Sequence, residues 1–362
     1  MRGQAGLKDS DGFAVLLSMK DFSIDLPGIM ARAAEADVSP LRQFLFDNPA
    51  QPLVATGSGG AESVADFAAL LYGARGGIAT AVSPYTLNSF SDAALRTSKL
   101  LLVSAGGHNN DIAFAARRGL AVNPEGTASL TFSRGDRNVV RALFAKAGSP
   151  RSFDIPVLHT HDGFVSTGTP VSFFALLCRA FDPGCDLSRY ARCPGDPYRL
   201  ERSDGSALTP EAFRGVNHFV ILHGSWGRPV AANLEGKLVE SGLCTAGVFD
   251  YRSLCHGRFM LISNHLEDAA VVMLISPRER DIAARTRKFL PASTRLVIIE
   301  TAADAPEASL DLLIRTSAFY FALCGATGTD WESPKNPGRI DKRVPMWVPF
   351  TAELKKSGPL GL

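Results

Sequence analysis

The sequence has little excess charge, few cysteines and no long apolar run, and each shortage excludes a class of protein. Its 362 residues carry 38 Lys and Arg against 36 Asp and Glu, a formal net charge of +2. This balance gives no electrostatic basis for binding nucleic acid or an anionic membrane surface. Apolar runs such as residues 269–275 fall far below the roughly 20 residues that cross a bilayer. The first residues make a poor signal peptide. We therefore expect neither a nucleic-acid nor a membrane partner.

Cysteine is scarce, with six residues and no C-x-x-C pair. In a chain of this length such cysteines favour buried thiols in a reducing compartment over a disulfide framework. We therefore expect a cytoplasmic protein. The length exceeds what one hydrophobic core usually organises, which predicts two domains.

What the chain does contain is a repeated alternation of strand and helix patterns. An apolar run at 52–56 is broken by glycines and followed by a helical pattern at 61–77, and residues 100–119 repeat this plan. The alternation restarts with an apolar run at 218–225 and a helical pattern at 228–242. Short Gly/Ser loops between such elements are typical of a doubly wound parallel sheet. The sequence predicts two similar α/β domains.

Changes in composition predict the domain boundaries. Pro, Gly, Asp and Arg become frequent between Asp182 and Thr209, as in an interdomain connection. Two further apolar runs, at 119–124 and 258–263, are interpreted as strands. The predicted division is a helical segment at 1–50, a first domain at 51–181, a linker at 182–213, a second domain at 214–350 and a tail at 351–362.

Two loops of the first half join a strand to a helix and offer donors to a ligand. The loop at 56–62 lacks the G-x-G-x-x-G spacing of a dinucleotide site, and its glycines also fit a simple tight turn. The loop at 104–111 places Ser104, His108 and Asn109 where open α/β sheets bind ligands. Helix capping by its asparagines is the alternative. Two such loops in one domain favour ligand binding.

Two groups of polar residues carry candidate chemistry. His159 and His161 alternate along a predicted strand, so both could meet one metal ion, although no third ligand follows from the spacing. A strand-end histidine near the ligand crevice is the alternative. Lys237 and Glu240 lie three residues apart in a helical pattern and share one face. A surface ion pair is the commonest role of such spacing.

The stretch that contains this pair, RPVAANLEGKLVESGLCTAGVFDYRSLCHGRFMLI (228–262), resembles the sugar isomerase (SIS) domains. It is most similar to the isomerase half of glutamine–fructose-6-phosphate aminotransferase. Without a gap, Lys237, Glu240 and His256 fall on that family's isomerase lysine, catalytic glutamate and ring-opening histidine. The first half resembles the first SIS domain through ATGSGGAES and LLLVSAGGHNNDI. The resemblance implies two tandem flavodoxin-like SIS domains, each a parallel sheet flanked by helices.

The sequence departs from that family in three places. No counterpart of the glutaminase domain is found, so glutamine-dependent amination is not expected. The family's phosphate cradle, S-x-S-x-x-T, keeps only Ser104 here, and its first-loop serine falls on Gly59. The C-terminal lysine that meets the sugar carbonyl falls on Arg339, which cannot form a Schiff base. The expected substrate-binding residues are Ser58, Gly59, Ser104, Gly106, His108, Asn109 and Arg339.

The resemblance implies an aldose–ketose isomerase, or a related deaminase or deglycase, that acts on a sugar or sugar phosphate without a cofactor. Glu240 would transfer the proton through an enediol, Lys237 would stabilise the oxyanion and His256 would open the sugar ring. In the family this histidine reaches the neighbouring subunit, which implies a homodimer with shared active sites. One alternative is an inactive sugar-phosphate-binding regulator or assembly partner. A weaker one is a metal-dependent hydrolase that uses His159, His161 and Asp162.

Overall fold

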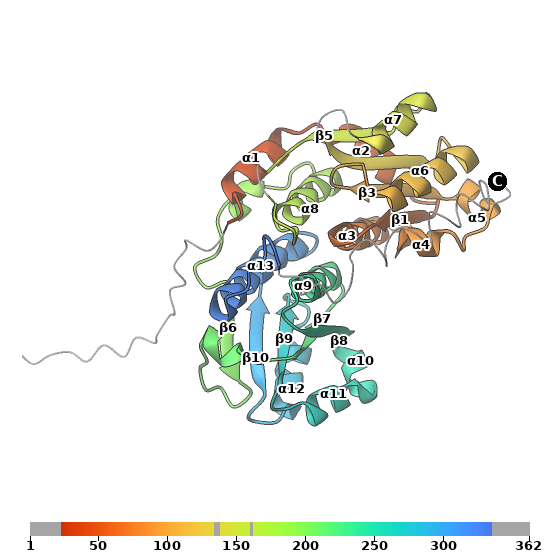
Figure 1. The fold of residues 1–362 in the computed structure, drawn as a ribbon. Helices are drawn as coiled ribbons and strands as arrows, with labels where there is room; N and C mark the ends of the chain where they lie inside the picture. Colours follow the sequence, from red (N-terminus) through yellow and green to blue (C-terminus); the bar gives the residue numbers. More distant parts are fainter. Residues whose placement is uncertain (1–22, 134–137, 160–161, 335–362) are drawn as a thin grey trace, which may run out of the picture.

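Two five-stranded sheets, each accompanied by helices, form the described part of the chain (Figure 1). The computed structural model describes residues 23–133, 138–159 and 162–334. The first sheet has the order β2-β1-β3-β4-β5, and its strands are all parallel. The second has the order β6-β10-β9-β7-β8. The predicted α/β fold class is confirmed.

Apolar runs become fully buried strands in the first sheet. All residues of β1 and β3 are buried, as expected where helices cover both faces of a parallel sheet. Helices α1 and α2 pack against α8 and contribute Ile29 and Leu41 to the same core. The strands are β1 (Leu53–Gly57), β2 (Ala79–Val82), β3 (Lys99–Ser104), β4 (Thr127–Ser133) and β5 (Ser152–Pro156). The helices are α1 (Leu26–Glu35), α2 (Ser39–Phe46), α3 (Gly60–Ala74), α4 (Pro84–Leu87), α5 (Asp92–Thr97), α6 (Asn110–Val122), α7 (Val139–Lys146) and α8 (Gly168–Phe181).

The second sheet is mixed, which corrects the prediction that both sheets are parallel. Its strands are β6 (Arg199–Arg202), β7 (His218–His223), β8 (Thr245–Asp250), β9 (Ala269–Ile275) and β10 (Arg295–Glu300). Strand β6 pairs antiparallel with β10 at the edge. It was missed because its sequence, RLER, has no apolar run, and it lies in the predicted linker. The helices are α9 (Arg228–Glu240), α10 (Tyr251–Ser253), a π-helical turn (Leu254–Arg258), α11 (Phe259–Asn264), α12 (Arg280–Phe289) and α13 (Glu307–Thr327).

Two strand predictions were wrong. Residues 258–263 lie mostly in helix α11, which begins just after Gly257, a residue with φ of 92°. Residues 119–124 form the end of helix α6 and its C-cap, Asn123. Short apolar runs have the same composition in buried strands and buried helices, so periodicity alone does not separate them.

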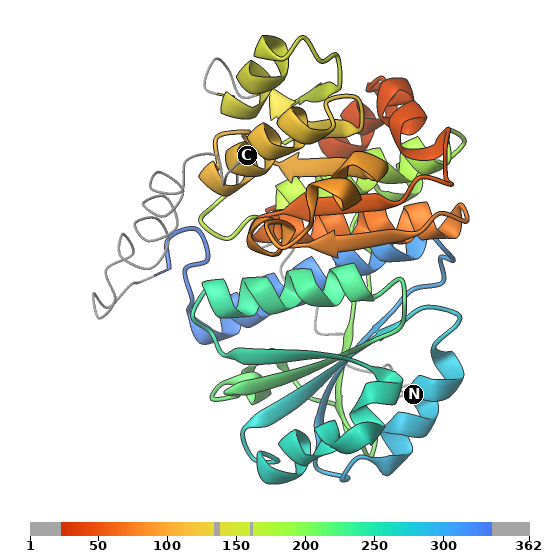
Figure 2. The same ribbon diagram turned by 90° about the vertical axis from the view of Figure 1, so that its right-hand side faces the viewer.

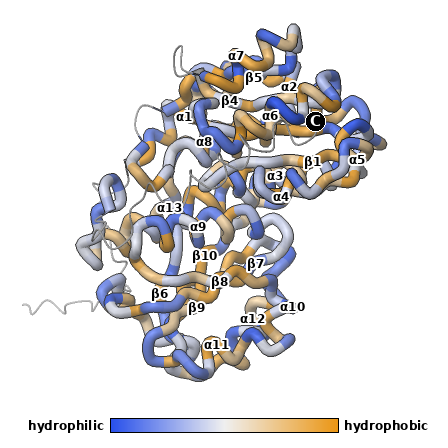
Figure 3. The backbone as a smooth tube through the Cα atoms, turned by 45° about the vertical axis from the view of Figure 1, so that its right-hand side comes forward, coloured by the Kyte–Doolittle hydropathy of each residue, from blue (hydrophilic) through white to orange (hydrophobic). Residues whose placement is uncertain are grey.

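Four helices fill the space between the two sheets. Helices α3 and α8 of the first domain contact α9 and α13 of the second, and Figure 2 shows α9 and α13 lying across the second sheet. Phe67 of α3 stacks on Phe174 of α8 with 4.3 Å between the ring centroids. It also contacts Trp226, just before α9, edge-on with 6.4 Å between the centroids. In Figure 3 hydrophobic stretches follow β7 and β10 beneath this layer. One continuous apolar core therefore fixes the two domains against each other.

Among the described residues, none of the helices has the combination of length and apolar character that a bilayer span requires.

Candidate functional site

The site lies where the loop after β1 meets the end of α9. Gly59 is the N-cap of α3 and has φ of 57° and ψ of −133°, a conformation that favours glycine. A Cβ atom placed on Gly59 would lie 3.9 Å from Oε1 of Glu240. Glu240 is the last residue of α9, so a carboxylate from the second domain lies beside the first loop of the first domain. The structure thus brings together two of the residues expected from the sequence.

Lys237, one turn before Glu240, is buried in the interdomain layer. Its side chain is 3% exposed, and its Nζ donates to Oγ of Ser317 on α13 at 3.1 Å. Burial lowers the pKa of Lys237 to about 8, although the negative charges of Asp162 and Glu240 act in the opposite direction. The surface ion pair considered from the sequence is therefore wrong for this lysine. It is a desolvated ammonium group beside the candidate base.

Glu240 is an exposed residue whose carboxylate lies beside Gly59. Partial burial raises the pKa of the carboxyl group, the negative charge of Glu235 raises it further, and Lys237 opposes both. The residue as a whole is exposed, but the carboxylate beside Gly59 is the part that does chemistry, and its surroundings decide its basicity. A carboxylate with a raised pKa is a better general base near neutral pH.

Further acidic groups surround this carboxylate. Burial raises the pKa of Glu62, on the first turn of α3, and the charges of Asp66 and Glu235 add to this effect. Arg228 at the start of α9 pairs with Asp66 across the domain interface at 3.3 Å.

Asp162 closes the next side of the site by capping helix α8. Its carboxylate accepts from the backbone amides of Thr167 and Gly168 at 2.8 and 2.7 Å and lies 3.1 Å from Nε2 of His159. Burial alone would raise the pKa of Asp162, but hydrogen bonds from His159 and the helix end hold it well below its usual range. The loop that follows Asp162 adjoins the loop after β1, because a Cβ atom placed on Gly60 would lie 3.8 Å from the Cβ of Ser166.

The contacts of His159 and Asp162 within the fold are relevant to the metal site considered from the sequence. His159 is buried and its Nε2 also lies 2.9 Å from Oγ1 of Thr169, so its ring and Asp162 both bind to the start of α8. His161 lies outside the described residues. The capping role of Asp162 was missed because it depends on amides that only the folded chain brings into reach.

The second predicted loop uses several of its polar groups internally. Oγ of Ser104 accepts from the amide of Gly107 at 3.2 Å. Asn109 is the N-cap of α6, which is the alternative considered from the sequence. The imidazole of His108 lies over Gly106, where a Cβ would come within 2.5 Å of it, and His108 is exposed. In the first loop, by contrast, Oγ of Ser58 is buried without a hydrogen-bond partner among the described residues.

His256 lies away from this site within one chain. It is exposed in the π-helical turn after β8, whereas α9 ends before the start of that strand. Six residues of strand separate the two ends by about 20 Å. The expectation that Lys237, Glu240 and His256 share one crevice is therefore not met within a single chain. Arg339 lies outside the described residues.

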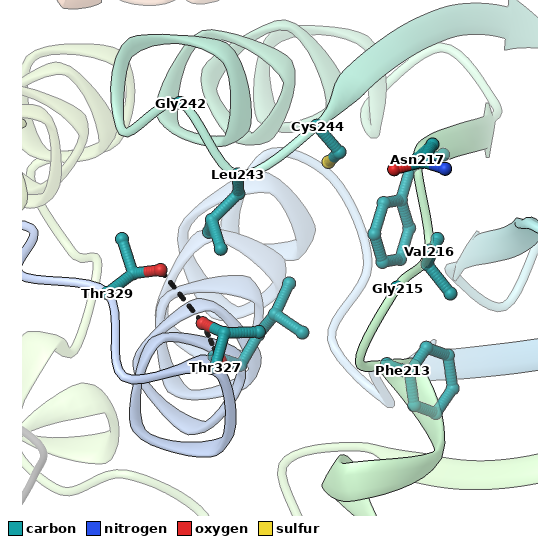
Figure 4. A pocket seen from close by; sticks show the side chains of 11 residues that line it. Phe213, Gly215, Val216, Asn217, Gly242, Leu243, Cys244, Thr327 and Thr329 are labelled. Carbon is teal, nitrogen blue, oxygen red and sulfur yellow. Dashed lines mark hydrogen bonds between the residues drawn. The ribbon is translucent and has the colours of Figure 1, made fainter. Parts of the chain in front are cut away.

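A separate small pocket of about 180 Å³ lies between the end of α13 and the segments that lead into β7 and β8 (Figure 4). Phe213, Leu243 and Leu323 contribute to its lining, and the hydroxyls of Thr327 and Thr329 are hydrogen-bonded at its edge at 2.9 Å. None of the described candidate site residues lines it.

Comparison with known proteins identifies the fold. No family model and no curated protein sequence matches the chain. The C-terminal domain of glucosamine-fructose-6-phosphate aminotransferase from Francisella tularensis matches in structure with a TM-score of 0.63 and 13% identity, over 91% of this chain and 100% of that one. Tagatose-6-phosphate ketose/aldose isomerase from Escherichia coli gives 0.62 and 16%, over 85% and 92%. Glucosamine-6-phosphate deaminase from Thermotoga maritima gives 0.60 and 16%, over 86% and 97%. The predicted double SIS fold is confirmed.

The buried ammonium group leads to a prediction about stability. Because the pKa of Lys237 falls from 10.5 to about 8 on folding, the charged lysine destabilises the folded state by about 3 kcal/mol below pH 8. This deficit disappears as the pH rises from 8 to 10.5, where the folded chain has released a proton that the unfolded chain still holds. We expect Lys237→Met to be more stable than the wild type at pH 7, with the difference shrinking across that window in urea denaturation.

The control is Lys146→Met, at the exposed end of α7, which should change stability little at any pH. A Lys237→Met variant that is less stable than the wild type at pH 7, or a difference that does not depend on pH, would contradict this account.

Proposed function

We propose that this chain is an aldose–ketose isomerase, or a related deaminase or deglycase, that moves a proton between neighbouring carbons of a sugar or sugar phosphate. One observation carries the proposal. The carboxylate of Glu240, with its raised pKa, lies beside Gly59 and one turn from the buried Lys237. The titles of the structural neighbours name a ketose/aldose isomerase and a sugar-phosphate deaminase, which supports this class of chemistry.

The proposed mechanism needs one base and one cation. Glu240 removes the proton from the carbon beside the substrate carbonyl, which gives an enediol, and the same carboxyl group returns the proton to the neighbouring carbon. Lys237 retains its proton near neutral pH, since the pKa is lowered only to about 8. Its positive charge stabilises the oxyanion that develops as the carbon loses its proton. A positioned base typically contributes about 10²–10⁴ in rate.

The first loop supplies the proposed contacts to the sugar. Oγ of Ser58 is buried without a partner among the described residues, and Gly59, the N-cap of α3, provides no side-chain cap. The hydroxyl of Ser58 can both donate to and accept from sugar oxygens. The acidic surroundings formed by Glu62 and Glu235 favour placing hydroxyl or amino groups, not phosphate, next to Glu240.

We further propose that His256 acts from a second copy of the chain. It is exposed at the far end of β8 from Glu240, so a homodimer would have to bring one chain's imidazole to the other chain's carboxylate.

All six cysteines are free thiols, which fits a cytoplasmic location.

A catalytically inactive sugar-binding regulator is the second candidate. The observation that favours it is the second loop, where Ser104 bonds the amide of Gly107 and Asn109 caps α6. These groups are used within the loop, and Gly106 has no side chain to bind a phosphate. A regulator would bind a sugar without exchanging its protons.

Replacement of Glu240 tests the isomerase proposal. We expect Glu240→Gln to lower the rate of solvent deuterium incorporation beside the carbonyl of candidate sugars by at least ~10² and to leave ligand binding nearly unchanged, because the amide keeps the shape of the side chain. NMR of the sugar measures the exchange. Glu35→Gln, an exposed residue at the end of α1, is the control. Binding without exchange in the wild type supports the regulator, and full exchange in Glu240→Gln would remove Glu240 from the mechanism.

Mixed dimers test the shared site. Glu240→Gln and His256→Asn chains should each be inactive alone on cyclic sugars, whereas their mixture should recover up to about a quarter of the wild-type activity per dimer formed at random. Turnover of the mixed, refolded protein is the measurement. Unchanged activity in His256→Asn alone, or a mixture with no recovery, would count against a histidine supplied by the partner.

A further inference from the structure

A cluster of two imidazoles and a carboxylate lies at the start of the second sheet, outside the proposed isomerase site. His218 is the first residue of β7, His265 is the C-cap of α11 and Asp268 immediately precedes β9. One ligand atom from each of the three lies within 4.8 Å of the other two. We propose that His218, His265 and Asp268 bind a divalent transition-metal ion of the zinc type.

The spacing of the side chains fits such an ion. Nδ1 of His265 lies 3.4 Å from Oδ1 of Asp268, and Nε2 of His218 lies 3.7 Å from Oδ2. A tetrahedral zinc ion with bonds of about 2.0–2.1 Å holds neighbouring ligand atoms about 3.3 Å apart. The two imidazole rings lie 4.4 Å apart and are tilted by 57°, so small side-chain rotations bring all three groups to one centre.

The hydrogen bonds around His218 indicate that Nε2, the ring nitrogen that faces the carboxylate of Asp268, is an acceptor. Oγ1 of Thr245 donates to the carbonyl oxygen of Asn217 at 3.0 Å. A hydroxyl has a single proton, so in the arrangement in which Thr245 gives that proton to the Asn217 carbonyl, Nδ1 of His218 is the donor in its 2.7 Å contact with Oγ1 of Thr245. In the neutral ring the lone pair on Nε2 then points toward the carboxylate of Asp268. Two acceptors facing each other repel, and a cation between them turns this repulsion into attraction.

The surroundings of the cluster resemble those of an oriented metal centre. Thr245 fixes the ring of His218 through the nitrogen that does not face the cluster, as outer partners of metal-bound histidines do. Nδ2 of Asn217 donates to Oδ2 of Asp268 at 3.3 Å, which holds the carboxylate in place. Histidine nitrogens and carboxylate oxygens are both ordinary zinc ligands.

Access to solvent is sufficient for an ion to enter and keep water in its fourth position. The side chains of His218, Asp268 and His265 are 28%, 35% and 40% exposed. The amide of His218 also donates to the carbonyl oxygen of Asp268 at 3.2 Å, so the backbone already holds these two ligands together. The ion would link the start of β7, the end of α11 and the start of β9, and none of these groups takes part in the proposed proton transfer.

Zinc binding to the EDTA-treated full chain tests the proposal. We expect about one zinc ion per chain by equilibrium dialysis and a higher melting temperature with zinc than without it. His265→Gln and Asp268→Asn should each weaken zinc binding by at least ~10-fold. The matched control is His108→Gln, an exposed histidine in the first domain, which should bind zinc as the wild type does.

A milder variant covers the case in which a ligand replacement disturbs folding, which circular dichroism without zinc would reveal. Thr245→Val keeps all three ligands and removes only the hydroxyl that orients His218, so it should weaken zinc binding less than the ligand variants do. Absence of saturable zinc binding in the wild type would overturn the proposal. Equal zinc affinity in the wild type, His265→Gln and Asp268→Asn would also overturn it.

Discussion

The desolvation of one ammonium group between the two domains is the constraint on which the proposed site depends. Lys237 is buried where α9 packs against α13, and its compensating contacts come from both halves of the chain. Ser317 of the second domain accepts its hydrogen bond, and Asp162 of the first domain supplies a negative charge. A buried cation is tolerated only when such partners surround it. The environment of Lys237 therefore exists only while the domains are docked.

The same docking sets the environment of Glu240. Stacking of Phe67 on Phe174, with Trp226 against them, fixes α3 and α8 relative to α9. This places the end of α9 beside Gly59, whose backbone conformation favours glycine and where a Cβ would lie 3.9 Å from Oε1 of Glu240. Burial and neighbouring acids then raise the pKa of Glu240. Burial of these charged groups lowers the stability of the folded chain, which is common for groups that carry out chemistry.

Sequence patterns predicted the parts of this structure that depend on local periodicity. Apolar runs gave β1 and β3, and three-residue spacing placed Lys237 and Glu240 on one helical face. The polar edge strand β6 and the helix α11 were not predicted, because the first lacks an apolar run and the second is a short apolar run that fits either element. Asp162 entered only the weaker alternative of a metal-dependent hydrolase, and its capping role was not predicted because the fold brings the amides of Thr167 and Gly168 to it. His218, His265 and Asp268 were not singled out, since the pairing of β7 with β9 is what brings them together.

The central claim is that interdomain burial makes Glu240 a base with a raised pKa, and carboxyl carbon NMR of protein labelled at the glutamate side chains tests it most directly. The account predicts a resonance that titrates above the ordinary glutamate value of about 4.3 and is missing from the spectrum of Glu240→Gln. A resonance assigned in this way that titrates at or below the ordinary value would contradict the account, because the carboxylate would then be a solvated surface group.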